Sequence, residues 1–394
     1  MEAFFFLILI LLAIPVIIFA VEIFLAVFLG NRATLSEVSM SVFPTTVILI
    51  PAHNESSNIV ATLRSIQDQR FDQLSVLVVA DNCDDDTASI VKNENIGVIE
   101  RHNSQLRGKG YALDFGIQYL AKNHPPEVVV ILDADCTLGN GALAILLKSL
   151  QTHRRPIQAC YQMYFEGVKS FNARIVEFAW LVKNSIRPLG LHALNLPCHL
   201  MGTGMAFTWE MVSKVSFANG NLVEDMKLGV DLCKAGYAPL FCPASTVISQ
   251  FPLNQVGLKT QRTRWEHGHL TMIIKEGPRL LLNGCLKRDL HQISMSLDMM
   301  VPPFALLFLL VFTMFLTLVL FNYFTGLSDS LCLVIIYLIV IALAVTTGWY
   351  RFARQLISFK ELLMAPIYVA SKIPLYLNFI VKRQVEWVRT KRDS

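Results

Sequence analysis

The stretch VVVILDAD, residues 128–135, decides the fold predicted for the centre of this chain. Its run of aliphatic residues stops at two carboxylates, Asp133 and Asp135. The same pattern occurs twice earlier, in TTVILIPAHNE, which ends at Glu55, and in SVLVVAD, which ends at Asp81. Open α/β folds bind ligands in the crevice at the carboxyl ends of parallel strands. The acidic strand ends therefore predict a ligand site at one edge of a parallel sheet.

Helical patterns separate these apolar runs, as they do in βαβ units. The predicted strands are residues 46–51, 74–80, 98–100 and 128–132, and the predicted helices are 56–69, 86–93 and 110–122. Neither GxGxxG after a strand nor GxxxxGK[ST] occurs, which excludes the common dinucleotide and P-loop fingerprints. An α/β domain with another kind of ligand site is expected.

The ends of the chain are apolar enough to cross a membrane. Only 16% of all residues are charged, whereas typical globular chains have about 25%. A span of about 30 Å needs about 20 apolar residues, and residues 3–29, 299–322 and 331–349 each satisfy this length. Residues 362–381 contain Pro366, Lys372 and Pro374, so a re-entrant or interfacial segment is predicted, with a full crossing as the alternative.

Charges beside these segments predict the orientation. The first segment has no basic leader, so a retained span is expected instead of a cleaved signal peptide. Arg32 follows it, the loop 322–330 has an acid and no base, and bases are frequent from Arg351 to Arg392. The positive-inside rule then places the central domain in the cytoplasm of a multi-pass membrane protein. A net charge of +4 suits an anionic membrane surface and not nucleic acid.

Asp133 and Asp135 are the candidate metal ligands. Mg²⁺ takes few protein carboxylates and completes its shell with water and phosphate oxygens. The alternative for this pair is a helix cap or a solvated turn. Asp81 is a candidate acceptor for a base or ribose, whereas the acids at 84–86 are expected to form a solvated loop in which Asp86 caps a helix.

Lys109 lies in Arg-Gly-Lys-Gly, which opens a predicted helix whose amino terminus favours a phosphate; a plain turn is the alternative. Glu224 and Asp225 open another helix, where a carboxylate can serve as general base or merely compensate the helix dipole.

The motif QRTRW contributes Gln261, Arg264 and Trp265 on a basic helix. Arginine binds phosphate through its planar fork, and tryptophan stacks on a sugar or anchors at a bilayer surface. The following Glu-His-Gly-His, residues 266–269, is interpreted as structural, because histidines two apart on a helix do not share a face.

Taken in order, PAHNE, VVADN, DAD, GTGMAF, ED and QRTRW resemble the motifs of membrane-embedded family 2 glycosyltransferases, over roughly residues 44–275. That family includes cellulose, hyaluronan and poly-N-acetylglucosamine synthases and ceramide glucosyltransferase. The resemblance implies a GT-A fold, a Rossmann-like parallel or mixed sheet, with inversion at the anomeric carbon. It also implies a nucleotide-sugar donor, UDP-glucose or UDP-N-acetylglucosamine, with Mg²⁺ or Mn²⁺.

By this likeness, the site residues fall into four groups. Asp225 would be the catalytic base with Glu224 beside it, and Asp133 and Asp135 would hold the metal. Gly202, Thr203 and Gly204 would line the acceptor site together with Trp265. The donor would be bound by Ala52, His53, Glu55, Asp81, Lys109, Asp133, Gln261, Arg264 and Trp265.

The expected domains are a transmembrane helix at 1–30, a GT-A domain at 44–252, interfacial helices at 253–297, two transmembrane helices at 298–350, and a re-entrant or interfacial segment with a basic tail at 351–394. The expected setting is a bacterial plasma membrane, with a lipid-linked or polysaccharide acceptor, membrane lipids and proteins of a polysaccharide export system as partners. Few spans and the missing Gly-rich stretch after Trp265 leave processive or single addition open. The alternative is a transporter or channel regulated by nucleotide, for which Glu22, Lys372 and Asp298 are the candidate pathway residues.

Overall fold

The computed structural model describes residues 2–30, 43–69, 71–218, 220–252, 254–326 and 329–381, and these residues form two compact units. The sheet unit contains residues 43–166 and 197–265, and the helical unit contains residues 2–30, 167–196 and 266–381. The sequence boundaries did not separate residues 167–196 from the domain predicted at 44–252. The bases at Arg32 and beyond residue 381, used above for orientation, lie outside the described residues.

The sheet unit is built on one mixed eight-stranded sheet with the order β3-β2-β1-β4-β7-β6-β8-β5. Its strands are β1 (Thr46–Ala52), β2 (Leu74–Asp81), β3 (Gly97–Arg101), β4 (Val128–Ile131), β5 (Thr137–Leu138), β6 (Ile157–Tyr164), β7 (Met205–Thr208) and β8 (Leu240–Gln250). The predicted parallel pairing is confirmed for β1 to β4. Ile48, Leu49 and Ile50 are fully buried, as expected for a strand covered on both faces.

Strand register brings several loops to one edge of this sheet. Ala52 lies opposite Ala80, and Leu49 lies opposite Ile131, so β1, β2 and β4 end at the same edge. Strand β7 runs antiparallel to β4, and its first residue, Met205, lies opposite Ile131. The residues that precede β7 therefore meet the residues that follow β1, β2 and β4.

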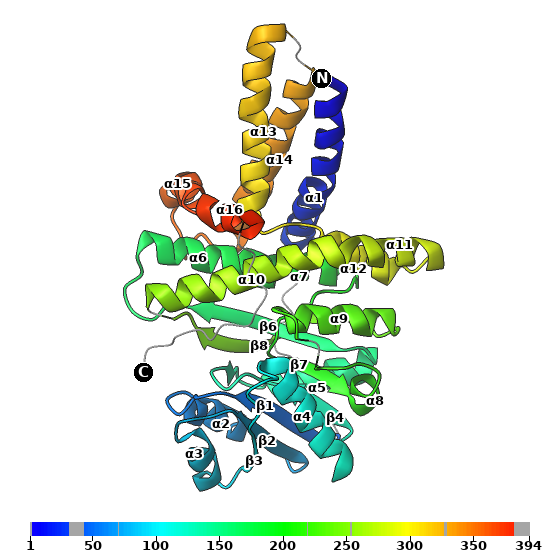
Figure 1. Ribbon diagram of the computed structural model, residues 1–394, viewed down its shortest axis with the longest axis vertical. Coiled ribbons are helices and arrows are strands. Elements are labelled where there is room, and N and C mark those ends of the chain that lie inside the picture. Colours follow the sequence, from blue (N-terminus) through cyan, green and yellow to red (C-terminus); the bar gives the residue numbers. More distant parts are fainter. Residues whose placement is uncertain are drawn as a thin grey trace. The chain divides into compact units, whose positions relative to one another are not determined.

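Helices accompany the strands of this unit (Figure 1). They are α2 (Ile59–Gln67), α3 (Thr87–Asn93), α4 (Lys109–Lys122), α5 (Ala142–His153), α8 (Trp209–Val212) and α9 (Glu224–Lys234). Asp86 occupies the N-cap position of α3, as predicted, but its side chain makes no capping hydrogen bond, and the Asp85 carboxylate accepts the Thr87 N–H at 3.0 Å instead. It also accepts the Ser56 N–H at 3.1 Å, and these hydrogen bonds outweigh burial and lower the pKa of Asp85. Asp85 therefore joins the loops after β1 and β2.

The helical unit contains three long apolar helices, α1 (Glu2–Phe28), α13 (Phe304–Thr325) and α14 (Asp329–Phe352), drawn side by side in Figure 1. The Tyr337 hydroxyl donates to the Leu9 carbonyl at 3.1 Å, which joins α14 to α1. By length and composition each helix can cross a membrane. Helix α13 begins at Phe304 and not at 299, because Pro302 and Pro303 separate it from α12 (Leu290–Met299).

The segment 359–381 is apolar enough to be a fourth candidate span, but it is two helices. Helix α15 (Phe359–Ala370) has 12 residues and α16 (Ile373–Val381) has 9, with a turn at Ser371–Lys372. At 1.5 Å per residue neither helix alone covers a core of about 30 Å. Figure 1 shows both helices near one end of α13 and across its direction.

The remaining helices of this unit are α6 (Phe171–Leu181), the π-helix η1 (Val182–Ile186), α7 (Arg187–Ala193) and α11 (Gly277–Lys287). Arg187 links three elements at a buried site. Its Nε lies 2.5 Å from Glu22 Oε2 on α1, and its Nη2 lies 2.5 Å from Asp298 Oδ1 on α12. All three side chains are at most 9% exposed, so this cluster depends on mutual neutralisation.

Helix α10 (Gln255–Lys275) carries QRTRW and then the Glu-His-Gly-His stretch. Lys372 Nζ lies 2.5 Å from Glu266 Oε1. His267 Nε2 lies 3.2 Å from the Leu375 carbonyl, and His269 Nε2 lies 3.0 Å from the Met299 carbonyl. These contacts give the stretch a structural role, as its sequence predicted.

Candidate active site

Lys109, the first residue of α4, is at the centre of a group of charged side chains at the sheet edge. Its Nζ lies 2.5 Å from Asp133 Oδ1 and donates to the Gly202 carbonyl at 2.8 Å. Burial alone would lower the pKa of Lys109, but the charges of Asp133, Glu224 and Asp225 outweigh burial and raise that pKa. The charged lysine therefore joins the loop after β4 to the loop before β7.

Hydrogen bonds fix the loop that precedes β7. The Asp133 N–H donates to the Thr203 hydroxyl at 3.0 Å, and the Gln158 amide donates to the Thr203 carbonyl at 2.9 Å. Gly202 and Gly204 have φ angles of +92° and +64°, a region that residues with a Cβ rarely adopt. The predicted acceptor-site residues are thus held at the sheet edge by buried polar contacts.

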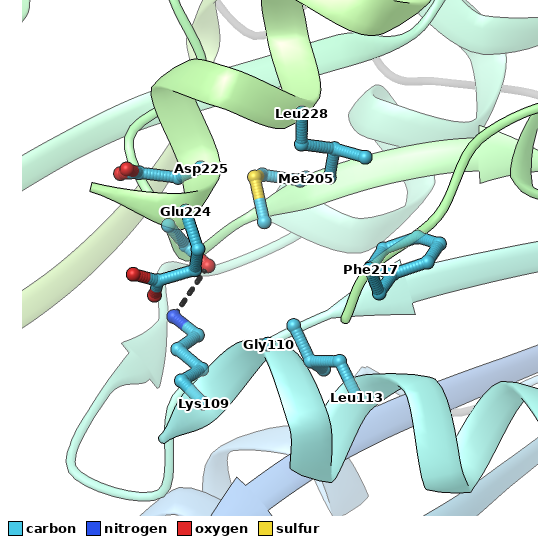
Figure 2. A pocket seen from close by; sticks show the side chains of 9 residues that line it. Lys109, Gly110, Leu113, Met205, Phe217, Glu224, Asp225 and Leu228 are labelled. Carbon is cyan, nitrogen blue, oxygen red and sulfur yellow. Dashed lines mark hydrogen bonds between the residues drawn. The ribbon is translucent and has the colours of Figure 1, made fainter. Parts of the chain in front are cut away.

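Asp225 approaches the same loop from α9. A Cβ placed on Gly202 would lie 3.2 Å from Lys109 Nζ and 3.3 Å from Asp225 Oδ2. Asp133 and Asp225, which are far apart in sequence, therefore converge on Lys109 and Gly202. Figure 2 shows Glu224 and Asp225 on the same side of a small pocket as Lys109. Met205, Phe217, Leu228, Gly110 and Leu113 line the rest of that pocket.

Glu224 and Asp225 form an acid pair with an unusual proton affinity. Burial and the neighbouring Asp225 raise the pKa of Glu224 to about 7, although the charges of Lys109 and Arg264 act in the opposite direction. Glu224 retains some exposed surface but is closely surrounded by protein atoms. It therefore titrates near neutral pH, as site carboxylates with perturbed pKa values often do.

Gln261 and Arg264 lie on the part of α10, up to Trp265, that belongs to the sheet unit. The influence of Arg264 on the pKa of Glu224 places the guanidinium near the acid pair. Gln261 Oε1 and Arg264 Nε are buried and make no hydrogen bond to other described residues. Buried polar atoms normally have partners, so these two atoms fit a ligand that supplies both donors and acceptors.

Asp133, Asp135 and Cys136 place their potential ligand atoms within 4.8 Å of one another. Cys136 is fully buried, and burial with the charges of Asp135 and Asp133 raises the pKa of its thiol well above the usual value. A thiol that keeps its proton is a poor ligand. The two partly exposed carboxylates fit a hard cation that retains water or phosphate oxygens, such as Mg²⁺ or Mn²⁺.

A second group of predicted residues lies at the ends of β1 and β2. Asp81 Oδ1 lies 2.6 Å from Arg101 Nη1, and both side chains are buried. His53 Nδ1 lies 2.6 Å from the Asp81 carbonyl, and Glu55 accepts a hydrogen bond of 2.9 Å from Asn58. Ala52 is buried as the last residue of β1. Arg101 was not predicted, because its contact with Asp81 depends on the register that places the two residues opposite each other in β2 and β3.

Comparison with known proteins decides the family. Residues 44–268 match the family model described as "Glycosyltransferase like family 2". The chain belongs to glycosyltransferase family 2. It is 28% identical to a probable glycosyltransferase, YdaM, of Bacillus subtilis, over 60% of this chain and 58% of that protein. It is 22% identical to the poly-β-1,6-N-acetyl-D-glucosamine synthase of Staphylococcus epidermidis, over 58% and 55% of the two chains. The matches thus cover less than three fifths of each of these relatives.

A solved structure supports the fold. A mannosyltransferase from Pyrobaculum calidifontis, determined with GDP-mannose and Mn²⁺, aligns with a TM-score of 0.54 at 16% identity. The alignment covers 95% of this chain and all of that one. The mixed sheet with its helices is accordingly a GT-A fold, as predicted. The long apolar helices α1, α13 and α14, with the apolar α15–α16 segment, fit the membrane-embedded members of family 2.

Proposed function

We propose that this protein is a metal-dependent, inverting glycosyltransferase of the cytoplasmic membrane face. It transfers a sugar from UDP-glucose or UDP-N-acetylglucosamine to a lipid-linked or polysaccharide acceptor. The observation that carries the proposal is the convergence of Asp133 and Asp225 on Lys109 and Gly202. A carboxylate for the donor side and a carboxylate for the acceptor side then share one site.

Asp225 acts as the general base in this proposal. The acceptor hydroxyl gives its proton to the Asp225 carboxylate while its oxygen forms a bond to the anomeric carbon. The bond from that carbon to the diphosphate breaks, and its electron pair stays on the diphosphate oxygen. One displacement from the opposite face inverts the centre and needs no enzyme nucleophile. Glu224 keeps a proton below about pH 7 and so limits the negative charge near the diphosphate.

Positive charge stabilises the diphosphate as it leaves. Lys109 and Arg264 supply this charge from two elements of the sheet unit. Asp133 and Asp135 would hold a divalent cation, which supplies further charge to the diphosphate when bound. Gln261 and Trp265 on α10 are proposed to bind the donor, and Trp265 is proposed to contact the acceptor as well.

The ends of β1 and β2 are assigned to the nucleoside. Asp81, oriented by Arg101, would accept hydrogen bonds from the base or ribose, beside Ala52, His53 and Glu55. We propose N-acetylglucosamine or glucose as the transferred sugar. The first is supported by the similarity to a poly-β-1,6-N-acetyl-D-glucosamine synthase, and both are supported by the family resemblance.

The apolar helices supply the membrane context. Helices α1, α13 and α14 would cross a plasma membrane, and the sheet unit would lie on the cytoplasmic side, where bases flank the spans. A lipid or glycan acceptor, membrane lipids and proteins of a polysaccharide export system are the proposed partners. The residues that a transporter would need are engaged elsewhere, since Glu22 and Asp298 pair with Arg187, and Lys372 pairs with Glu266.

The test is incubation of the full-length protein in native membranes with a panel of nucleotide sugars, followed by mass analysis of products and released nucleotide. One UDP-sugar is expected to give product, with the opposite anomeric configuration from the donor. Absence of product and of nucleotide release with every donor would contradict the proposal. A product with one added sugar or a ladder of products distinguishes single from processive addition.

A further inference from the structure

Helix α11 has apolar residues on two opposite faces. One face packs on α12: Gly284 is buried, and a Cβ placed there would lie 2.9 Å from the Ile293 nitrogen. The opposite face carries Leu282 and Leu286, which are 62% and 76% exposed, and Leu290 at the start of α12 is 73% exposed. Three highly exposed leucines within nine residues suggest a surface that contacts an apolar partner and not water alone.

Exposed bases flank these leucines in the sequence. Lys275, Arg279, Lys287 and Arg288 are all exposed. Arg279 lies three residues before Leu282, so both side chains share one side of the helix. The neighbouring acid Asp289 is engaged as the cap of α12, accepting the His291 N–H at 3.0 Å and the Gln292 side-chain amide at 2.8 Å. The exposed side of α11 is therefore both apolar and positively charged.

The connection from α12 to α13 indicates how close the exposed side of α11 lies to the membrane. Helix α12 ends at Met299, and α13 begins at Phe304 after two prolines. With 22 residues α13 is about 33 Å long, enough to cross a bilayer, so its first residue lies near a membrane surface. Arg351 and Arg354 lie at the same end of the α13–α14 pair, and the sequence 322–330 at the other end has no base. This arrangement is typical of the side that faces anionic lipids.

We propose that the α11 surface, formed by Lys275, Arg279, Leu282, Leu286, Arg288 and Leu290, binds the headgroup layer of acidic phospholipids. The leucines enter the upper acyl region while the bases contact lipid phosphates, as in amphipathic helices at membrane surfaces. Charge complementarity selects acidic lipid, and the leucines require an acyl layer that free phosphate does not provide. The inference rests on the membrane setting given under the proposed function and names the class of lipid, but it does not depend on sugar transfer.

The test uses the full-length protein in nanodiscs of phosphatidylcholine alone or mixed with phosphatidylglycerol. A fluorophore on the exposed Cys285, in a Cys332→Ser background, reports depth through quenching by lipids that carry a nitroxide. Quenching is expected to be strong in the mixed discs and weak in phosphatidylcholine alone. Inorganic phosphate added to phosphatidylcholine discs should not reproduce it.

Charge variants make the assignment specific. The double variant Arg279→Gln, Arg288→Gln should weaken the affinity of the α11 surface for phosphatidylglycerol roughly 30-fold. Each base contributes about 1 kcal/mol to binding an anionic surface. The matched control is Lys122→Gln with Lys148→Gln, which removes two exposed bases from α4 and α5 and should change nothing. Equal quenching in both kinds of disc, full quenching in the arginine variant, or cross-links through Cys285 between two copies would overturn the proposal. No readout requires a sugar donor, so failure here is distinguishable from failure of the glycosyltransferase assignment.

Discussion

Glu224 and Asp225 are adjacent residues that the site uses differently. Glu224 has a pKa raised to about 7, chiefly by burial and by Asp225. Below this pH its carboxyl group is neutral, and above it a second negative charge stands beside Asp225 and near the proposed diphosphate. The sign of the effect on donor binding follows: rising pH weakens the affinity for the anionic donor.

We therefore expect the Kd for UDP-sugar to rise about three- to tenfold as the pH rises from 6 to 8. A tenfold rise corresponds to a loss of about 1.4 kcal/mol in binding free energy. Glu224→Gln should flatten this dependence, because its side chain is neutral throughout. Isothermal titration calorimetry of UDP-sugar binding to wild type and to Glu224→Gln, between pH 6 and pH 8, tests both expectations. An equally steep profile in the variant would contradict the assignment of the titration to Glu224.

Gly202 is required by space as well as by its backbone angle. A Cβ there would crowd Lys109 and Asp225, and φ is +92°. Gly202→Ala is expected to reduce transfer at least tenfold with modest loss of stability. Gly141→Ala is the matched control, because Gly141 has φ +66° and nothing within 4 Å of its added Cβ. Both melting temperature and transfer rate are measured, and equal rates in the two variants would contradict a role for the space at Gly202.

Strands β1, β2 and β4 could be predicted from the sequence because each is a continuous apolar run followed by polar residues. Strand β3 has only two aliphatic residues, and its prediction depended on the alternation of strands and helices. The reversal of β7 could not, since its direction depends on pairing with β4, far away in sequence. For the same reason the hydrogen bond from Lys109 to the Gly202 carbonyl could not be predicted. Asp81 was predicted as a site residue but its partner Arg101 was not, because their contact depends on strand register.

Arg187 holds α1, α7 and α12 together through two buried carboxylates. Arg187→Met would leave Glu22 and Asp298 without a neutralising charge. The free energy of unfolding should fall by about 3–5 kcal/mol. Arg174→Met on α6 is the control: this arginine pairs with Glu361 at a more exposed place, where an ion pair contributes about 1 kcal/mol or less. Thermal unfolding in detergent should show a large loss for the first variant only. Equal melting temperatures would contradict the structural role of the cluster.

At the scale of the whole molecule, the proposal requires a divalent cation. Treatment with EDTA is expected to stop transfer, and Mg²⁺ or Mn²⁺ should restore it. Asp135→Asn should raise the metal concentration for half-maximal activity at least tenfold, because one of two proposed carboxylate ligands is lost. Mn²⁺ binding followed by electron paramagnetic resonance gives the same comparison without turnover. Activity that is indifferent to chelation would remove the metal from the account.

The sequence predicted three apolar spans and an uncertain fourth segment, and the structure divides that segment into α15 and α16. The break coincides with Lys372, whose partner Glu266 is remote in sequence. Hydropathy alone could not show this contact. The grouping of residues 167–196 with the long apolar helices likewise depends on tertiary packing.

The central claim is that one site contains the base for the acceptor and the charges for the donor. The most direct test compares wild type with Asp225→Asn in native membranes, with sugar transfer from a radiolabelled nucleotide sugar and donor binding measured on the same samples. Transfer should fall about 10²- to 10⁴-fold, the usual contribution of a general base, while the donor Kd changes by less than about threefold. Near-normal transfer by Asp225→Asn would contradict the account.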